Sequence, residues 1–263
     1  MLACVFEIAR NMRLLTIILL TTSLTTWGQT NKEMKPAIGY LVDKSPDGEI
    51  EFTRQKEKCS EVWARPHNIL NDEEKKTLEY CNDNFDRVEN YYDILGPGCS
   101  WYCGGGIDTQ TSSSELNSQG QNSYSASNAH DLNYKTAWVE GVPGYGIGEY
   151  LVYLFPPESP RITKVIIANG YVKSNKSWTE NSRVKKLRLY IDDKPVAILN
   201  LEDTKAEQSF TFDPIGHGDR IDFKKLKSMS AWTMKFEIMD VFKGEKYDDT
   251  AITEIYFDGI DVH

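Results

Sequence analysis

Oxygen-bearing side chains gather in residues 124–140, a segment rich in small residues that ends just past a tryptophan. Ca²⁺ takes about six to eight oxygen ligands, so a loop of this kind needs a remote carboxylate to complete the shell. Glu254 can supply it if the last strand lies beside this loop. The expected metal ligands are the carbonyl of Ala129 and the side chains of Asp131, Asn133, Thr136 and Glu254. An Asx-rich turn held by its own backbone hydrogen bonds fits the same spacing. Lys135 excludes an EF-hand, since it stands where a ligand is required.

Four of the five cysteines lie downstream of residue 50: Cys59, Cys81, Cys99 and Cys103. An even number in an exported chain favours two disulfides, with three possible pairings. A four-cysteine zinc site is disfavoured because the paired C-x-x-C spacing is absent. A redox-active pair at Cys99 and Cys103 is also disfavoured, because three residues separate them and the thioredoxin motif has two.

The N-terminus has the pattern of a signal peptide over residues 1–29, initiated at Met12. Its apolar core, Leu14–Leu20, is too short for a membrane span, which needs about 20 residues. No other long apolar segment follows, so we expect a secreted or periplasmic protein without a transmembrane anchor. The formal charge of −9 argues against a nucleic-acid partner.

One helix is predicted over residues 71–95, with its apolar residues on one face. Asn71 can cap it, Glu74 completes a capping box, and Asn82-Asp83-Asn84 is a possible interruption. Residues 30–107 are therefore interpreted as a small N-terminal region tied by disulfides. Residues 108–123 are rich in Thr, Ser, Gln, Asn and Gly, which is typical of a solvated connector.

Beyond the connector the hydrophobic period becomes two, which predicts strands. Residues 150–155 are apolar on both faces, as in a central strand, whereas 186–191 have one wet face. The other expected strands cover 163–168, 195–201, 209–212, 220–223, 232–241 and 251–257. About eight strands without a helix pattern predict a mainly β domain over 124–263, an antiparallel sandwich or jelly roll.

Several segments in order carry a resemblance to a known family. They are Ala137–Gly141, Gly146–Glu149, Ile167–Ser174, Asn181–Lys185 and Asp240–Gly244 followed by Asp248–Ile255. Residues 113–260 resemble the NADase-type glycan-binding domain, the translocation domain of bacterial NAD-glycohydrolase toxins, within the discoidin-like, galactose-binding-like superfamily. The resemblance implies a jelly roll, a structural Ca²⁺ near Asp131 and Glu254, and carbohydrate recognition by loops at one end. It implies no NAD hydrolysis, since the toxin's catalytic domain is a separate unit.

Sugars are bound by aromatic rings and by polar side chains that pair with hydroxyls. Within the resembling region the expected glycan-binding residues are Tyr145, Asn169, Tyr171, Lys173, Trp178, Asn181, Arg183, Asp240, Asp248 and Asp249. For Tyr171 and Trp178 core packing is an equally good interpretation, and Arg183 could form a structural ion pair with Glu140. Trp138 is expected in the core.

The sequence does not complete either of two catalytic signatures. Gly144-Tyr-Gly146-Ile-Gly148 lacks the following helix of a dinucleotide-binding unit, and the four histidines stand in no recognisable catalytic frame. The sequence thus favours a non-catalytic exported protein that binds a glycan or a glycosylated surface. Two alternatives stay open: a polysaccharide hydrolase and a structural or protein-binding surface component. In the hydrolase the active site would include Glu61, Trp63, His67 and Asp93. The sequence does not indicate the oligomeric state of the protein.

Overall fold

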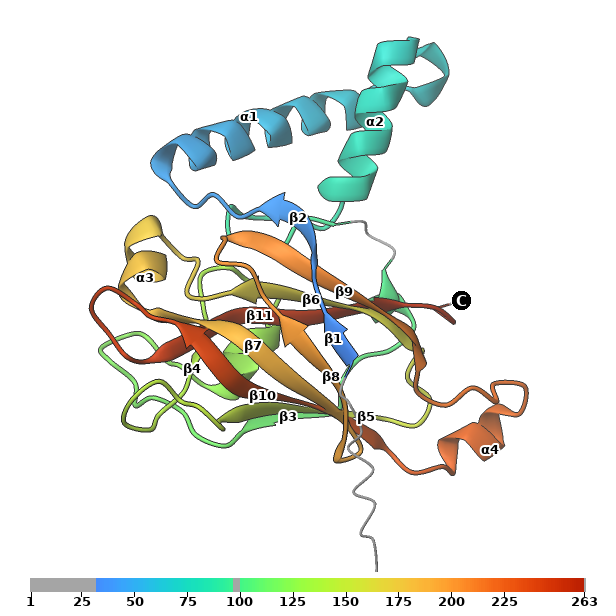
Figure 1. Cartoon of the computed structure of the whole chain (residues 1–263). Coiled ribbons are helices and arrows are strands. Elements are labelled where there is room, and N and C mark those ends of the chain that lie inside the picture. The colour runs from blue at the N-terminus through green and yellow to red at the C-terminus, as the bar shows by residue number, and fades with distance from the viewer. Residues whose placement is uncertain (1–31, 97–99, 263) are drawn as a thin grey trace, which may run out of the picture. The chain divides into compact units, whose positions relative to one another are not determined.

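A computed structural model describes residues 32–96 and 100–262 (Figure 1). The predicted signal peptide and Cys99 lie outside these residues. Within them, eleven strands join one hydrogen-bonded sheet in the order β2-β9-β6-β11-β7-β10-β5-β3, with β1 on β8, β8 on β7 and β4 on β11. The strands are β1 (Lys32–Met34), β2 (Ala37–Leu41), β3 (Thr109–Ser112), β4 (Trp138–Val139), β5 (Tyr150–Phe155), β6 (Ile162–Asn169), β7 (Ser182–Ile191), β8 (Lys194–Asn200), β9 (Ala206–Ile215), β10 (Trp232–Phe242) and β11 (Thr250–Gly259).

The sheet folds into the expected β-sandwich. Strands β9, β6 and β11 form one layer, and β8, β7, β10, β5 and β3 form the other. The layers meet through fully buried rings: Tyr153 and Phe155 of β5 each lie 5.2 Å, centroid to centroid, from Phe257 of β11. Trp138 is also fully buried, as expected of a core residue. In β7 the apolar alternation over 186–191 correctly predicted the buried face, since Leu187 and Leu189 are buried and Lys186 and Arg188 are not.

Most predicted strands are confirmed, and β5 has the predicted bounds. It lies between β10 and β3, but only one of its faces is fully buried, although its sequence is apolar on both. The prediction of a strand at 220–223 is wrong. Asp222 caps a short helix there, α4 (Phe223–Lys227), by accepting from the backbone N–H groups of Lys224 and Lys225.

The N-terminal region carries two longer helices, α1 (Pro46–Trp63) and α2 (Asp72–Asn84). The predicted capping box of α2 is confirmed, and the helix ends at Asn84, inside the polar run. Cys59 of α1 and Cys81 of α2 form a disulfide. Helix α1 was not predicted, although Ser45 caps it and Pro46 occupies its first turn. The described residues also contain three 3-10 turns: η1 (His67–Ile69), η2 (Trp101–Cys103) and η3 (Ala126–His130).

The helical pair is joined to the sandwich near the predicted cation loop. The backbone N–H of Tyr134 donates to the carbonyl of Tyr92 at 2.8 Å, and Ile94 donates to Leu132 at 3.2 Å. Lys44 is buried, with its ammonium 4.2 Å from the ring centroid of Tyr91 and 4.7 Å from that of Tyr134. Burial lowers the pKa of Lys44 to about 8. These contacts place the N-terminal region against residues 132–134.

Replacing Cys59 and Cys81 together by serine is expected to destabilise the helical pair. The bridge closes a loop with a sequence separation of 22 residues. For a loop of this length, chain entropy predicts that removing the bridge lowers the free energy of unfolding by about 3 kcal/mol. Urea unfolding followed by far-ultraviolet circular dichroism measures the loss. An unchanged unfolding midpoint would show that packing of α1 on α2 suffices without the bridge. Adding reductant to the double variant should have no effect on this transition.

Candidate functional site: a cation loop and a polar cleft

The predicted cation loop packs directly on strand β11. The Oε1 atom of Glu254 accepts from the backbone N–H groups of Asp131 at 3.0 Å and Asn133 at 3.2 Å. The carboxylate of Asp131 in turn accepts from the Asn133 N–H at 3.1 Å and from the Thr136 hydroxyl at 2.6 Å. Leu132, between them, has a φ of +57°, so the loop curls tightly at this point. The topology thus brings the remote carboxylate to the loop, as the sequence predicted.

Glu254 is fully buried, and its Oε2 atom has no hydrogen-bond partner. Burial, and then the neighbouring carboxyl of Asp131, raise the pKa of Glu254 well above its ordinary value. A buried carboxylate oxygen without a partner is costly, and a cation between the two carboxyl groups would remove the cost.

Two further predicted ligand oxygens accept hydrogen bonds from within the protein. The Ala129 carbonyl accepts from the Tyr153 hydroxyl at 3.1 Å, and the Asn133 side-chain oxygen accepts from the Lys135 N–H at 2.9 Å. Both oxygens keep a second lone pair. The donor set is all oxygen with two carboxylates, which fits Ca²⁺ better than a transition metal. In the described residues no three His, Cys, Asp or Glu side chains cluster as a metal site, so an ion at this loop would need amide, hydroxyl and carbonyl oxygens as its other ligands.

A cleft of about 520 Å³ opens among three loops of the sandwich. One wall comes from residues 116–124, a second from 171–181, which contains α3 (Asn175–Glu180), and the third from 247–249. Its lining residues are Leu116, Gln119, Asn122, Tyr124, Val139, Tyr171, Lys173, Ser174, Lys176, Ser177, Glu180, Asn181, Tyr247 and Asp249. The cleft therefore mixes rings, amides, hydroxyls and charges on segments that are distant in sequence.

The rings and charges of the cleft have defined positions. Tyr124 and Tyr171 stand edge to face, with centroids 6.4 Å apart, at the base. Lys173 reaches across to the Asn122 side-chain oxygen at 3.3 Å. Burial, and then repulsion from Asp248, raise the pKa of Asp249. Tyr124 and Tyr171 are buried, at 9% and 8% exposed, whereas Tyr247 is 40% exposed. The opening therefore offers the Tyr247 ring, a cationic donor and a carboxylate acceptor over a floor of two buried rings.

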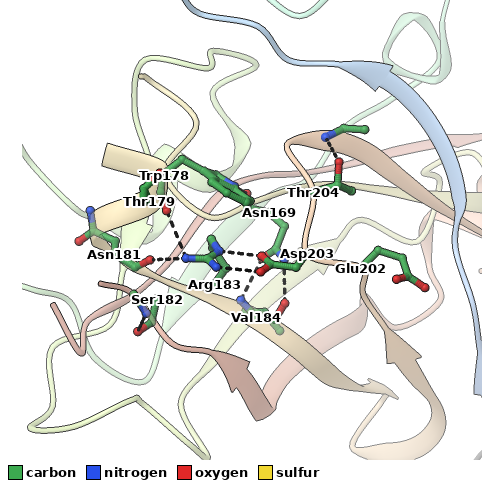
Figure 2. A network of polar contacts seen from close by, with 12 residues as sticks. Asn169, Trp178, Thr179, Asn181, Ser182, Arg183, Val184, Glu202, Asp203 and Thr204 are labelled. Carbon is green, nitrogen blue, oxygen red and sulfur yellow. Dashed lines mark hydrogen bonds and ion pairs between the residues drawn. The ribbon is translucent and has the colours of Figure 1, made fainter. Parts of the chain in front are cut away.

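Beside the cleft, Arg183 is enclosed by protein groups (Figure 2). Its guanidinium forms a two-pronged ion pair with Asp203 at 2.8 and 2.9 Å, and it also donates to the carbonyl of Asn181. The same group stacks 4.4 Å from the ring centroid of Trp178. Gly170, with a φ of +77°, leaves room for this stack, because a Cβ there would lie 2.5 Å from the Arg183 side chain. Arg183 thus pairs with Asp203 and not with Glu140.

The sequence profile of the NAD glycohydrolase translocation F5/8 type C domain matches residues 101–258, more than half of the chain. The chain belongs to this family.

The NAD glycohydrolase translocation match begins twelve residues before the resembling region that the motifs delimit, and it includes η2 and β3. It covers both the cation loop and the polar cleft. Membership in the F5/8 type C, discoidin-like group confirms the predicted fold.

Solved structures similar to this F5/8 type C chain include two that contain CBM32 domains of Clostridium perfringens. The CBM32-1 and CBM32-2 domains of ZmpB align at 14% identity and a TM-score of 0.41, covering 59% of this chain and 34% of theirs. The CpGH89CBM32-5 module in complex with GalNAc-β-1,3-galactose aligns at 14% identity and 0.40, covering 57% and 94%. The Streptococcus pyogenes NAD+-glycohydrolase translocation domain aligns at 26% identity and 0.32, covering 47% and 98%. The chain thus spans about a third of the ZmpB structure. No curated protein matches the chain significantly.

Four of the predicted glycan-binding residues line the cleft of this F5/8 type C domain: Tyr171, Lys173, Asn181 and Asp249. Asp248 is exposed next to it.

The amide of Asn169 is buried and exchanges two hydrogen bonds with the Val184 backbone, at 2.7 and 3.0 Å. Asp240 pairs with Lys185 at 2.8 Å, and the Tyr145 ring lies under the Lys243 ammonium at 4.8 Å. Trp178 donates to the Asn169 carbonyl.

Residues that the sequence did not single out supply the rest of the cleft. Gln119 and Asn122 come from the segment interpreted as a connector, Tyr124 begins the segment that follows it, and Tyr247 precedes the two aspartates. An aromatic residue in a Ser- and Asn-rich loop was the signal available for Tyr124.

The residues of the hydrolase alternative are placed on the N-terminal region. Asp93 accepts from the backbone N–H groups of Glu89 and Asn90, both at 2.8 Å, and so closes its own turn. The Trp63 indole donates to Asn82 at 2.8 Å. Glu61 lies on α1, and His67 begins η1. No described helix is long and apolar enough to cross a membrane.

Proposed function

We propose that this chain is a non-catalytic, exported binding protein whose polar cleft holds a glycan. The observation that carries the proposal is the convergence of Tyr247, Lys173 and Asp249 on one open cleft. Saccharides present C–H patches that pack on rings and hydroxyls that pair with charged and amide groups, and this cleft supplies both.

The electrostatics of the cleft favour a hydroxyl-rich ligand. Asp249 is half-buried, and the neighbouring Asp248 repels its negative charge. A hydrogen-bond donor that displaces water would therefore stabilise the Asp249 carboxylate. A sugar hydroxyl is such a donor. Lys173 has no carboxylate within ion-pair distance among the described residues, so its ammonium can donate to a ring or hydroxyl oxygen.

We further propose that Ca²⁺ binds between Asp131 and Glu254, with Ala129, Asn133 and Thr136 supplying the other oxygens. The unpartnered Oε2 of Glu254 supports this proposal. The ion's role would be structural: it would neutralise the buried carboxylate and hold residues 129–136 on β11. The cleft lies on other loops, so the ion is not placed in contact with the glycan.

Export is supported by the Cys59–Cys81 disulfide, since such bonds persist in oxidising compartments. The predicted partner is a glycan or glycosylated cell-surface component. GalNAc-β-1,3-galactose is one saccharide worth including in a first screen.

Glycan-array binding of the wild type and of Asp249→Asn tests the proposal. Losing a charge-assisted hydrogen bond costs about 1.5–3 kcal/mol, so we expect affinity to fall at least about tenfold. Asp213→Asn is the matched control, because Asp213 is an exposed carboxylate on β9. Wild-type protein that binds no saccharide on the array would overturn the proposal. Release of reducing sugar would instead favour the hydrolase alternative.

A further inference from the structure

The polar cleft carries charges of both signs on two separate walls. Lys173 and Lys176 lie on the wall formed by residues 171–181, the lysine wall. Asp249 lies on the wall formed by residues 247–249, the aspartate wall. The two walls come from different loops of the sandwich, so cations and a carboxylate reach the same opening from separate segments.

These charges are not neutralised within the part of the chain that the structure describes. No carboxylate there lies within ion-pair distance of Lys173 or Lys176, and no cation lies within that distance of Asp249. Glu180, the remaining charged residue that lines the cleft, differs because it pairs with Lys246 at 4.0 Å. Charged groups on a ligand would therefore find partners of opposite sign on both walls.

The aspartate wall is held in place by buried groups. Ser182 is fully buried; its N–H donates to the Asp249 carbonyl at 3.0 Å, and its hydroxyl donates to the Tyr247 carbonyl at 3.1 Å. Glu140, also fully buried, accepts from the Thr250 N–H at 3.2 Å. The backbone that carries Asp249 is thus fixed to the sandwich on both sides of this residue.

The lysine wall is fixed in a similar way. The Val172 N–H donates to the hydroxyl of the fully buried Thr253 at 3.0 Å. The Tyr171 carbonyl accepts from the Ser177 hydroxyl at 3.0 Å, which ties the residues before Lys173 to the helix after it. A ligand whose charges match both walls therefore binds without a large cost for ordering either loop.

We propose that the glycan held by the polar cleft is zwitterionic, with an anionic group bound by Lys173 and Lys176 and a free amino group bound by Asp249. This inference rests on the proposed glycan-binding function and adds the charge of the ligand to it. A saccharide with the anionic group alone would be repelled by Asp249 and its neighbour Asp248, and one with the amino group alone would be repelled by the lysines. The two walls together thus select a saccharide that carries both charges.

Four related monosaccharides test the proposal on the full chain. Glucosamine 6-phosphate carries both charges, N-acetylglucosamine 6-phosphate the anionic group, glucosamine the amino group, and N-acetylglucosamine neither. Their affinities are measured by calorimetric titration at one ionic strength, slightly below neutral pH, where the amino group is protonated and the phosphate is anionic. We expect glucosamine 6-phosphate to bind at least about tenfold more tightly than each of the other three, as for added hydrogen bonds between charged groups.

Variants on each wall assign the two charges. Lys173→Gln with Lys176→Gln should remove the advantage that the phosphate confers and keep the advantage of the amino group, whereas Asp249→Asn should do the reverse. Lys194→Gln and Asp213→Asn are the matched controls, since both residues are exposed, on β8 and β9. The control variants should bind all four sugars as the wild type does.

The outcomes separate this inference from the proposed function. Wild-type protein that binds glucosamine 6-phosphate no more tightly than its acetylated or unphosphorylated counterpart would overturn the inference, while binding of neutral array saccharides would leave the glycan-binding function standing. An equal loss of affinity for all four sugars in the wall variants would also overturn it, because the side chains would then contribute without distinguishing charge. A chain that binds no saccharide at all would overturn the proposed function and this inference together.

Discussion

Ca²⁺ added to chelator-treated protein is expected to raise the melting temperature by roughly 5–10 °C. A ligand that binds the folded form alone, at a hundred times its dissociation constant, stabilises by about 2.7 kcal/mol, and each kcal/mol moves the midpoint of a domain this size by about 2–4 °C. The physical source of the gain is Glu254, whose buried Oε2 atom lacks a partner. Differential scanning fluorimetry across a Ca²⁺ titration measures the shift.

Two glutamine variants make the calcium prediction specific. Glu254→Gln should abolish the response, because it removes the charge that the ion neutralises. Glu207→Gln is the control: Glu207 is a partly buried carboxyl, but it already accepts from the hydroxyls of Tyr134 at 2.5 Å and Tyr256 at 2.7 Å. Its variant should still respond to Ca²⁺. A full response in Glu254→Gln, or none in the wild type, would contradict the assigned site.

Arg183→Ala is expected to lower the free energy of unfolding by about 2 kcal/mol, as for the loss of hydrogen bonds to a charged group. The change removes the ion pair with Asp203 and the stack on Trp178 (Figure 2). Asp203 is 39% exposed and can regain water, which keeps the loss below that for a fully buried pair. Chemical denaturation of the variant and of Arg183→Lys measures the loss, and the lysine should recover part of it.

The same variant separates a structural role from a ligand contact. Arg183 does not line the cleft, so folded Arg183→Ala protein should lose less glycan affinity than Asp249→Asn does. Wild-type stability combined with lost glycan binding would instead place the Arg183 guanidinium on the ligand.

Strand positions were the most predictable part of the fold, because apolar alternation directly reports a half-buried sheet. Helix α1 was missed because it is largely polar, with Cys59 and Val62 its buried residues, so no long apolar stripe marks it. The four residues of 220–223 are too few for periodicity to separate strand from loop. There the side chain of Asp222 decides the structure by capping α4.

The contact of Glu254 with residues 131–133 was predictable, because the loop's oxygens are close in sequence and one distant carboxylate remained to be found. The cleft was harder to predict from the sequence, because three separate loops form it. Nothing near Arg183 in the sequence indicates that Asp203, on the β8–β9 connection, neutralises it. Likewise Tyr124 belongs to a polar segment whose return to the cleft depends on the pairing of β4 with β11.

A titration of ¹⁵N-labelled protein with a saccharide from the array tests whether the cleft binds the glycan. Binding there should produce amide chemical-shift changes concentrated at residues 119–124, 171–181 and 247–249, and these shifts should be lost in Asp249→Asn. Changes confined to α1 and α2, or to the sheet faces away from these loops, would contradict the assignment of the cleft as the glycan site.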